Sequence, residues 1–375
     1  MLYEIHMLKH YPPTNLNRDE TGSPKSCTYG GVMRGRISSQ CLKRSWRSSP
    51  LFQELLGENA TRSRSLPVLV EAELIRREIA PELIEVAVKK TTGIANESGK
   101  ESDDRTTSQI VFFSPIDVEA VTDMLKRISD ESGGVKEFAK VKSSDIAKKF
   151  KDVKLRPITL DIALFGRMVT SNAFANVEAA IQVAHGISTH AVNMESDYFT
   201  AVDDLIAAGQ SDATGAAMIG DIDFNSCCYY HYIAIDVDQL KENLAHSPDA
   251  QVLIEEVLPA FVQIMAFSNP SGKQNTFAGH VLPDLMAVEV KQKKIPLSYA
   301  GAFAKPVRAD SRHPIGLESA KALVDEIDCM DKAYGLPVLH RGWFCPRSPE
   351  TVPADAENMA SLDQLVKACT DWARE

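Results

Sequence analysis

The spacing of apolar and polar residues near the start of the chain predicts two neighbouring β-strands. LYEIHMLKH and GGVMRGRIS both alternate with a period of two. In the second segment, Arg34, Arg36 and Ser38 would share one solvent-facing side. Met33 and Ile37 would then face the core. The pattern therefore predicts a strand with one basic side.

A helix is predicted directly after this strand. Ser38 or Ser39 can cap its N-terminus. Leu42 and Trp46 lie four residues apart, so both would face the core. Its basic side chains would face solvent: Lys43, Arg44 and Arg47.

The remaining pattern predicts a helical insertion and a further set of strands. Apolar positions recur at helical spacing within residues 51–155, for example in LVEAELIRREI. Strand-like composition returns in PITLDIALFGRMVTSN, AIQVAHGISTH and DIDFNSCCYYHYIAIDV, with a connection of about 28 residues between the last two. An apolar helix containing Pro259, the strand DLMAVEVKQ and helical material follow. This order favours an antiparallel α+β sheet of ferredoxin-like type over a doubly wound nucleotide-binding sheet.

Composition is typical of a globular protein. The chain has 375 residues, of which 44% are hydrophobic and 25% charged, and its net charge is −10. We expect no apolar run long enough to cross a bilayer and no secretory signal, and therefore a cytoplasmic protein without a membrane partner. The seven cysteines form no CxxC pair, so reduced thiols are expected instead of disulfides or a zinc site.

Basic residues are concentrated in two segments of this acidic chain. Residues 1–48 hold eight Lys or Arg against three Asp or Glu, and residues 136–156 hold the same numbers. Salt screens charges beyond about 10 Å, so a local field can differ in sign from the total. In the first segment, a basic strand that leads into a helix N-terminus would attract phosphate. A solvated amphipathic surface is the alternative for both segments.

Catalytic and metal-binding motifs are not found. Ser271-Gly272-Lys273 lacks the preceding glycine and the following Ser or Thr of a phosphate-binding loop. His185 and His190 are five residues apart in a predicted strand, which places them on opposite faces and argues against a shared metal. Asp19 is the one carboxylate beside the basic segment that merits a test as a nuclease residue. We therefore expect no catalytic residue, metal or cofactor.

Several long strings, in order along nearly the whole chain, resemble one protein family. They are LNRDE, PKSCTYGGVMRGRISSQCLKR, DIALFGRM, IQVAHGISTHAVNMESDYFTAVDDL, GDIDFNSCCYYHY and SGKQNTFAGH. They resemble the backbone subunit of the type I-E CRISPR surveillance complex Cascade, the CasC family of the RAMP superfamily. The likeness is weakest in residues 51–155 and in about the last 60.

The resemblance implies a hand-shaped subunit that binds CRISPR RNA. Its palm would be a modified RRM-like sheet formed by residues 1–50, 156–190 and 222–375, the last range including C-terminal helices. Residues 51–155 would be helical fingers, and residues 191–221 a protruding thumb. Members of the family polymerise head to tail along guide RNA without catalysis and present its bases to target DNA. The implied partners are CRISPR RNA, target DNA paired to the guide, further copies of the chain and other Cascade subunits.

The resemblance also implies which side chains contact nucleic acid. Met168 would wedge against a base at a kink in the RNA, and Phe199 and Thr200 would hold a displaced nucleotide position open. The other implied RNA contacts are Arg18, Lys25, Arg36, Ser38, Gln40, Lys43, Arg44, Arg47, Arg167, Lys273 and Gln274. Candidates for guiding DNA are Lys148, Lys149, Lys151 and Lys154, for which a solvated helix face remains an equal alternative.

Two other functions remain open on the sequence. Some relatives in other CRISPR types cut RNA with an aspartate in the loop after the first strand, and Asp19 lies in such a loop. A metal-dependent RNA endonuclease is therefore the first alternative. A metabolic enzyme with an incidental basic patch is the second, and no motif supports it.

Overall fold

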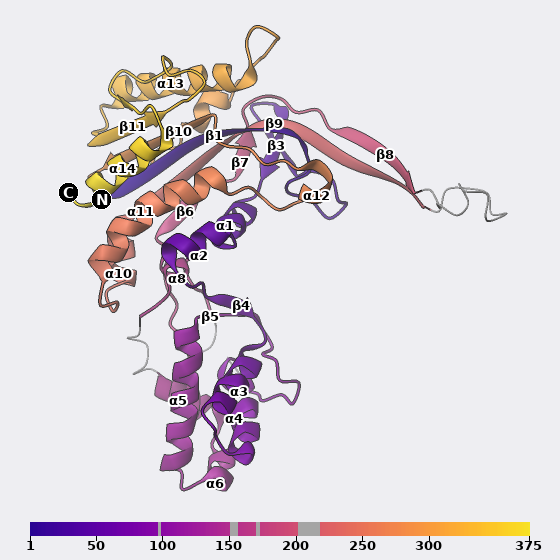
Figure 1. Ribbon diagram of the computed structural model, residues 1–375, viewed down its shortest axis with the longest axis vertical. Coiled ribbons are helices and arrows are strands. Elements are labelled where there is room, and N and C mark those ends of the chain that lie inside the picture. Colours follow the sequence, from indigo (N-terminus) through magenta and orange to yellow (C-terminus); the bar gives the residue numbers. More distant parts are fainter. Residues whose placement is uncertain (97–98, 151–156, 170–172, 202–217) are drawn as a thin grey trace, which may run out of the picture. The chain divides into compact units, whose positions relative to one another are not determined.

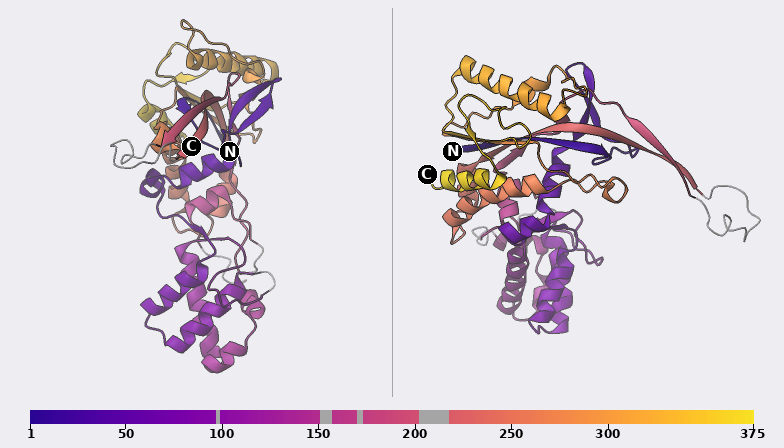
Figure 2. Two further views of the ribbon diagram at one scale, coloured as in Figure 1. Left: turned by 90° about the vertical axis from the view of Figure 1, so that its right-hand side faces the viewer. Right: turned by 45° about the horizontal axis from the view of Figure 1, so that its top comes forward.

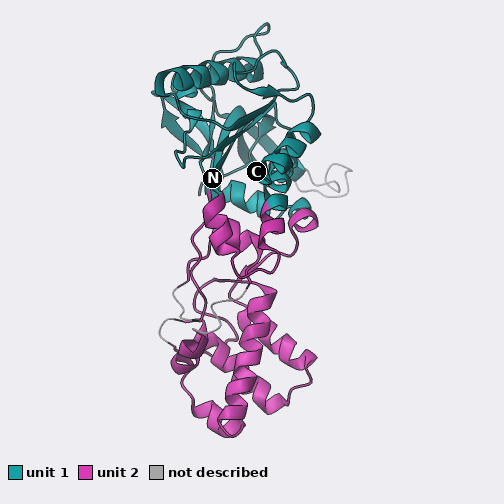
Figure 3. Ribbon diagram, turned by 90° about the vertical axis from the view of Figure 1, so that its left-hand side faces the viewer, with its two compact units in different colours: residues 1–52, 182–236, 255–375 teal, residues 53–181, 237–254 magenta. Residues whose placement is uncertain are grey.

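The computed structural model describes residues 1–96, 99–150, 157–169, 173–201 and 218–375, which form two compact units. We call residues 1–52, 182–236 and 255–375 the sheet unit, and residues 53–181 and 237–254 the helical unit (Figure 3). The helical unit therefore extends beyond the predicted insertion at residues 51–155.

The sheet unit is built on a ten-stranded, mainly antiparallel sheet (Figure 1). β6 (Ile181–Val183) and β8 (Glu195–Ala201) pair with β9 at its side. The main path runs β12 (Glu357–Asn358), β11 (His340–Phe344), β10 (Leu285–Lys291), β1 (Leu2–Thr14), β9 (Met218–Asp236), β7 (Gly186–Ser188), β3 (Val32–Ile37) and β2 (Ser26–Tyr29). The pair β11–β12 is parallel, and the pairs β1–β10, β1–β9, β10–β11, β2–β3, β3–β7, β7–β9 and β8–β9 are antiparallel. The fold is thus mixed α+β with a large antiparallel-dominated sheet.

Helices cover both faces of this sheet. α13 (Ile315–Tyr334) and the 3-10 helix η2 (Tyr299–Phe303) lie on one face, and α11 (Ala250–Phe267) and α14 (Leu362–Ala373) on the other (Figures 1 and 2). Because side chains of β1 alternate between the two faces of the sheet, neighbouring residues contact helices on opposite faces. Leu8 is buried in the same core cluster as Leu323 of α13, whereas Lys9 contacts α11.

α11 is the one helix of the described residues with the length and apolar composition of a membrane span, contrary to the expectation that no apolar run is long enough. It has 18 residues, and 56% of the segment is buried inside the protein. Phe261, for example, packs edge-on against Trp46 with ring centroids 5.4 Å apart. These are properties of a core helix, so its length is weak evidence for a membrane.

The helical unit has a core of its own. Its longer helices are α3 (Leu66–Arg76), α4 (Pro81–Ile94) and α5 (Pro115–Glu131), which share buried Leu74, Ala87 and Leu125. The capping box of Ser114 and Asp117 starts α5. The shorter elements of the unit, or bordering it, are α2 (Pro50–Leu56), α6 (Val135–Lys140), α7 (Ser143–Lys149), α8 (Leu160–Phe165), α10 (Val237–Asn243), β4 (Thr61–Ser63) and β5 (Val111–Phe113).

Three segments differ from the predicted secondary structure. The strand expected around DIALFG is the helix α8, in which Leu160, Ile162 and Leu164 are all buried. A continuous apolar run shows no period that distinguishes a strand from a helix. The strand expected at residues 180–190 is divided into β6 and β7. β11 and β12 lie in the C-terminal region, where only helices were expected.

Candidate nucleic-acid interface

The predicted basic helix is present as α1 (Ser39–Arg47), and its N-terminus is fixed to the loop after β1. Ser38 is the N-cap, and its Oγ accepts a hydrogen bond from the Cys41 N–H at 3.3 Å. The Ser38 N–H in turn donates to Asn17 Oδ1 at 2.8 Å. The first turn of α1 holds no acidic residue, so no side chain there compensates the positive end of the helix dipole.

The buried side of α1 agrees with its sequence pattern. Leu42 and Trp46 are buried, and Trp46 lies against α11. Gln40 and Arg44 are exposed, and Lys43 and Arg47 are half-buried. α1 is thus fixed by its apolar side while its basic side stays accessible.

Three cations lie close to α1, one of which, Arg44, belongs to the last turn of the helix. Arg36 Nη1 lies 2.9 Å from His185 Nδ1, and Arg36 Nε donates to the Ser26 carbonyl at 3.3 Å. Burial lowers the pKa of His185, and the charges of Arg36 and Lys25 lower it further. Burial raises the pKa of Cys41, while Lys25 and Arg44 oppose that rise. Cations from β3, from the loop before β2 and from α1 therefore act on one small region.

Within the described part of the chain, carboxylates do not neutralise these cations. Among the described residues no ion pair is found for five of the predicted RNA contacts: Arg18, Lys25, Arg36, Arg44 and Lys273. Such a group of cations can bind an anion of any source, and a nucleic-acid backbone supplies one phosphate per nucleotide.

Arg34 corrects the expectation of a uniformly basic side on β3. Its side chain is fully buried, and its guanidinium donates to the carbonyls of Tyr29, Ser188 and Phe303 at 2.7–3.1 Å. Met33, expected in the core, is 52% exposed. The guanidinium satisfies three carbonyls that the ends of neighbouring segments leave unpaired, which the period of two does not reveal.

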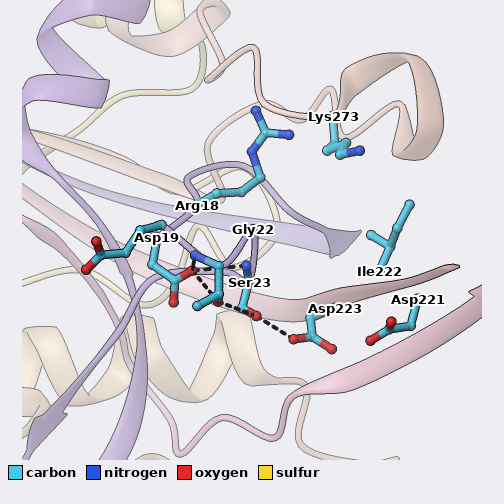
Figure 4. A pocket seen from close by; sticks show the side chains of 10 residues that line it. Arg18, Asp19, Gly22, Ser23, Asp221, Ile222, Asp223 and Lys273 are labelled. Atoms are coloured by element: carbon cyan, nitrogen blue, oxygen red, sulfur yellow. Dashed lines mark hydrogen bonds between the residues drawn. The ribbon is translucent and has the colours of Figure 1, made fainter.

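A pocket of about 570 Å³ lies beside the loop that joins β1 to β2 (Figure 4). Arg18 and Lys273 contribute its cations. Asp19, Glu20, Asp221 and Asp223 contribute carboxylates. Lys273 comes from the loop between α11 and α12 (Gln274–Phe277), so residues far apart in the sequence line one surface. Sequence reasoning missed Asp221 and Asp223, which lie on β9.

Asp19 is occupied in stabilising its own loop. Its Oδ1 accepts the Thr21 N–H at 2.9 Å, the Thr21 hydroxyl at 2.7 Å and the Ser23 N–H at 3.1 Å. The hydrogen bonds from Thr21 are the main cause that lowers the pKa of Asp19. Within the described residues no group of three or more His, Cys, Asp or Glu side chains is arranged to hold a metal ion.

Arg167 and Met168, which are adjacent in the helical unit, differ sharply in exposure. Arg167 is buried, and its Nη1 lies 2.8 Å from Asp117 Oδ2 while its Nε donates to the Ala175 carbonyl. Its guanidinium therefore already has buried partners, and its role as an RNA contact stays a prediction. Met168 is 93% exposed, directly after the turn that Arg167 holds.

Phe199 and Thr200 lie on the hairpin formed by β8 and the start of β9. They pair with Gly220 and Ile219 in antiparallel register. A Cβ at Gly220 would lie 2.6 Å from the Phe199 ring, so this position accommodates the aromatic side chain only because it is glycine. Residues 195–201 and 218–221 of the predicted thumb are therefore strand, and its residues 202–217 lie outside the described part.

The lysines predicted to guide DNA have acidic neighbours. Lys148 pairs with Asp145 at 3.0 Å, and Lys149 with Glu131 at 3.3 Å. All four side chains are at least half exposed. Lys151 and Lys154 lie outside the described residues.

Gln274 has a different local role from Lys273. Its Nε2 donates to the Pro270 carbonyl at 2.7 Å and so closes its own loop. Two further residues of this surface were not predicted as part of a nucleic-acid site, namely Asn17, which fixes the start of α1, and His185, which neighbours Arg36. Both contacts join segments that are distant in the sequence, so the local sequence pattern does not predict them.

Comparison with known proteins identifies relatives along the whole chain. A solved chain from a "CRISPR RNA-guided surveillance complex, pre-nicking" is similar with a TM-score of 0.84 and 26% identity, covering 100% of both chains. A second, from a "CRISPR RNA-guided surveillance complex", has a TM-score of 0.68 and 21% identity and covers 98% of this chain and 100% of that one, which shows a shared fold. None of the curated proteins matches. The family model of the CT1975-like proteins matches residues 3–368, and the chain therefore belongs to this family.

Proposed function

We propose that the chain is a noncatalytic backbone subunit of a type I-E CRISPR surveillance complex. It would polymerise head to tail along CRISPR RNA and grip the phosphates of the guide independently of sequence. The bases would remain free to pair with target DNA. Further copies of the chain and the other subunits of the complex would be its protein partners, in the cytoplasm.

The observation that carries this proposal is the cationic surface at the start of α1. Lys25 and Arg36 lie there, Arg44 follows in the last turn of α1, and no carboxylate of the described residues is ion-paired with these three. Gln40, Lys43 and Arg47 extend this surface along the helix, and the buried Ser38 caps its start and is proposed to contact the RNA there. Contacts of this kind bind phosphates and carry no sequence information, as a scaffold for many different guides requires.

The proposed roles of the other parts follow from the hand-shaped subunit that the sequence resemblance implies. Residues 1–50, 156–190 and 222–375 would be an RRM-like palm, residues 51–155 the fingers and residues 191–221 the thumb. Met168 is proposed to wedge against a base, since a flexible, 93% exposed apolar side chain suits that contact. Phe199 and Thr200 would act at the thumb, and Arg18 and Lys273 at the pocket. Similarity to chains of two CRISPR RNA-guided surveillance complexes over almost the full length supports these roles.

Fluorescence anisotropy of the purified chain with two unrelated labelled single-stranded RNAs tests the proposal. We expect both RNAs to bind with similar affinity and with a steep dependence on salt concentration. Binding to one RNA alone would contradict a backbone grip. If neither RNA binds to the lone chain, the same measurement is made on the chain co-expressed with the other subunits of the complex. Absence of RNA binding by that complex would overturn the proposal.

An RNA endonuclease that uses Asp19 is the alternative, and no observation favours it over the loop-stabilising role. Incubation of the assembled complex with complementary RNA and Mg²⁺ distinguishes the two. We expect intact RNA with the unmodified chain and with Asp19→Ala. Cleavage that Asp19→Ala abolishes would establish the nuclease and contradict the noncatalytic scaffold.

A further inference from the structure

A lysine is buried at the centre of the sheet unit. Lys9, on β1, is only 1% exposed, and no ion pair involves it among the described residues. Its Nζ donates to the Met265 carbonyl at 3.0 Å and to the Ser268 carbonyl at 2.8 Å, and lies 3.4 Å from Asn269 Oδ1. A buried cation without a carboxylate is costly unless its donors are satisfied.

The three acceptors belong to the C-terminus of α11 and the residues directly after it. α11 ends at Phe267, so the Met265 carbonyl is one of the last-turn carbonyls without a partner in the helix. A cation at this end also interacts favourably with the helix dipole. The Tyr11 hydroxyl donates to the same Asn269 Oδ1 at 2.9 Å. Lys9 and Tyr11 of β1 therefore fix the residues that directly follow α11 by hydrogen bonds.

The loop after α11, residues 268–273, packs tightly against the segment that follows β1. A Cβ at Gly272 would lie 2.2 Å from the Leu16 carbonyl oxygen, so the loop lies directly on the segment after β1. Lys273 has a φ of +50°, a left-handed conformation that a non-glycine residue adopts only when its surroundings impose it. Gln274 closes the turn through the Pro270 carbonyl. The side chain of Lys273 is thus placed at the pocket beside Arg18 by the path of this loop (Figure 4).

The groups that face Lys9 are neutral. On β9 they are His231, whose pKa is lowered to about 3 by burial and by Lys9, and Tyr229, whose pKa is raised by burial. Burial also raises the pKa of Tyr11. α11 presents backbone carbonyls to Lys9. In these surroundings burial lowers the pKa of Lys9 to about 7, well below the usual value of about 10.4 for lysine.

We propose that Lys9 is a positioning residue for nucleic-acid binding by Lys273. The hydrogen bonds of its ammonium hold the end of α11 and residues 268–274 against β1. We call these hydrogen bonds the tie. Without the tie, Lys273 is no longer held in the position at which it contacts a phosphate. This inference rests on the proposed function of the chain. The protonated side chain has a donor for each of the three oxygens, whereas the neutral amine has two, so the tie weakens at higher pH.

A double-mutant cycle tests the coupling between the two lysines. Lys273→Ala is expected to lower RNA affinity by about fivefold in the unmodified chain, as loss of one exposed charge contact does. In the Lys9→Met background the same substitution is expected to have almost no further effect. Arg44→Ala, on α1, is the matched comparison and should cause the same loss in both backgrounds. An undiminished effect of Lys273→Ala in the Lys9→Met chain would overturn the inference.

Hydrogen exchange of the free protein tests the same tie without RNA. Lys9→Met is expected to raise the exchange of amides in residues 268–279 about tenfold while leaving β1 and α13 unchanged. The exposed Lys293→Met, which removes the same charge from the same unit, should leave this loop unchanged. In the unmodified chain, protection of the loop should fall as pH rises through about 7, after correction for intrinsic exchange.

These two experiments separate failure of the inference from failure of the proposed function. If no RNA binds, the proposed function fails, and the exchange data still decide whether Lys9 holds the loop. If RNA binds but exchange of the loop does not change in Lys9→Met, the inference fails alone. Should Lys9→Met not fold, Asn269→Ala, which removes the acceptor shared with Tyr11, replaces it in both experiments. It is expected to show the same changes at smaller size, and their absence would overturn the inference.

Discussion

The two basic segments of the chain are alike in number of charges and unlike in how those charges are paired. Residues 1–48 and residues 136–156 each hold eight basic and three acidic side chains. In the second segment, Lys140 pairs with Glu137 at 2.7 Å and Lys148 with Asp145 at 3.0 Å. In the first, Lys25, Arg36 and Arg44 have no ion-paired carboxylate among the residues that the structure describes. The two segments therefore have the same formal charge in the sequence but produce different electrostatic fields at the protein surface.

The cause of the difference is local. In α6 and α7 an acidic residue precedes the lysine by three positions, which places both on one side of the helix. α1 holds no acidic residue, and its neighbouring cations come from other strands and loops. Exposed pairs contribute at most about 1 kcal/mol each and are easily broken, but they do cancel the local field. We therefore expect phosphate binding at α1 to exceed that at α6 and α7.

The largest expected effect is the loss of RNA binding when α1 loses two cations. Lys43→Ala with Arg47→Ala should weaken binding to unrelated RNAs to a similar degree. It should also reduce the slope of log affinity against log salt by roughly 0.7 per lost phosphate contact. Anisotropy titrations over a salt series measure both quantities. A loss confined to one RNA sequence would show base recognition instead of a backbone grip.

An intermediate effect is expected when the finger lysines lose their acidic neighbours. Glu137→Gln with Asp145→Asn leaves Lys140 and Lys148 unpaired, so affinity for duplex DNA at low salt should rise roughly threefold. Filter binding with a random duplex measures the change. Glu318→Gln, which frees Lys321 from a comparable surface pair in the sheet unit, is the control. Unchanged DNA binding would mean that pairing does not explain the contrast between the segments.

A smaller effect is expected when the paired lysines themselves are removed. Lys148→Ala with Lys149→Ala should change RNA affinity by less than about twofold, because their charges are already balanced by Asp145 and Glu131. The titration used for the α1 variant applies here too. A loss as large as that of the α1 variant would put both segments in the RNA site.

The smallest expected effect is a change in the titration of His185. Arg36→Met removes a charge that disfavours the imidazolium, so the pKa of His185 should rise toward its ordinary value. NMR titration of the imidazole follows this shift, with Arg312→Met as a control at an exposed, distant position. A pKa that does not move would show that burial alone lowers it and that the cations do not converge there.

Several features of the candidate interface were predictable from local pattern. The order Ser38, Leu42, Trp46 predicted a capped helix with a buried side, and α1 has both. Arg34 was not predictable in the same way, because its three carbonyl partners come from separate segments. Arg167 is a similar case, since its partner Asp117 lies 50 residues earlier. Burial of a charged side chain depends on acceptors that the neighbouring sequence does not contain.

The sequence by itself determined the helical period and cap of α1, the absence of acidic residues there, and a family likeness carried by long strings. Only the tertiary structure decided which cations lack acidic neighbours, which arginines are buried, and how Lys9 reaches the end of α11. The physical reason is the range of the interactions involved. Period and capping act over three or four residues, whereas ion pairs and buried hydrogen bonds join side chains that only folding brings within about 3 Å.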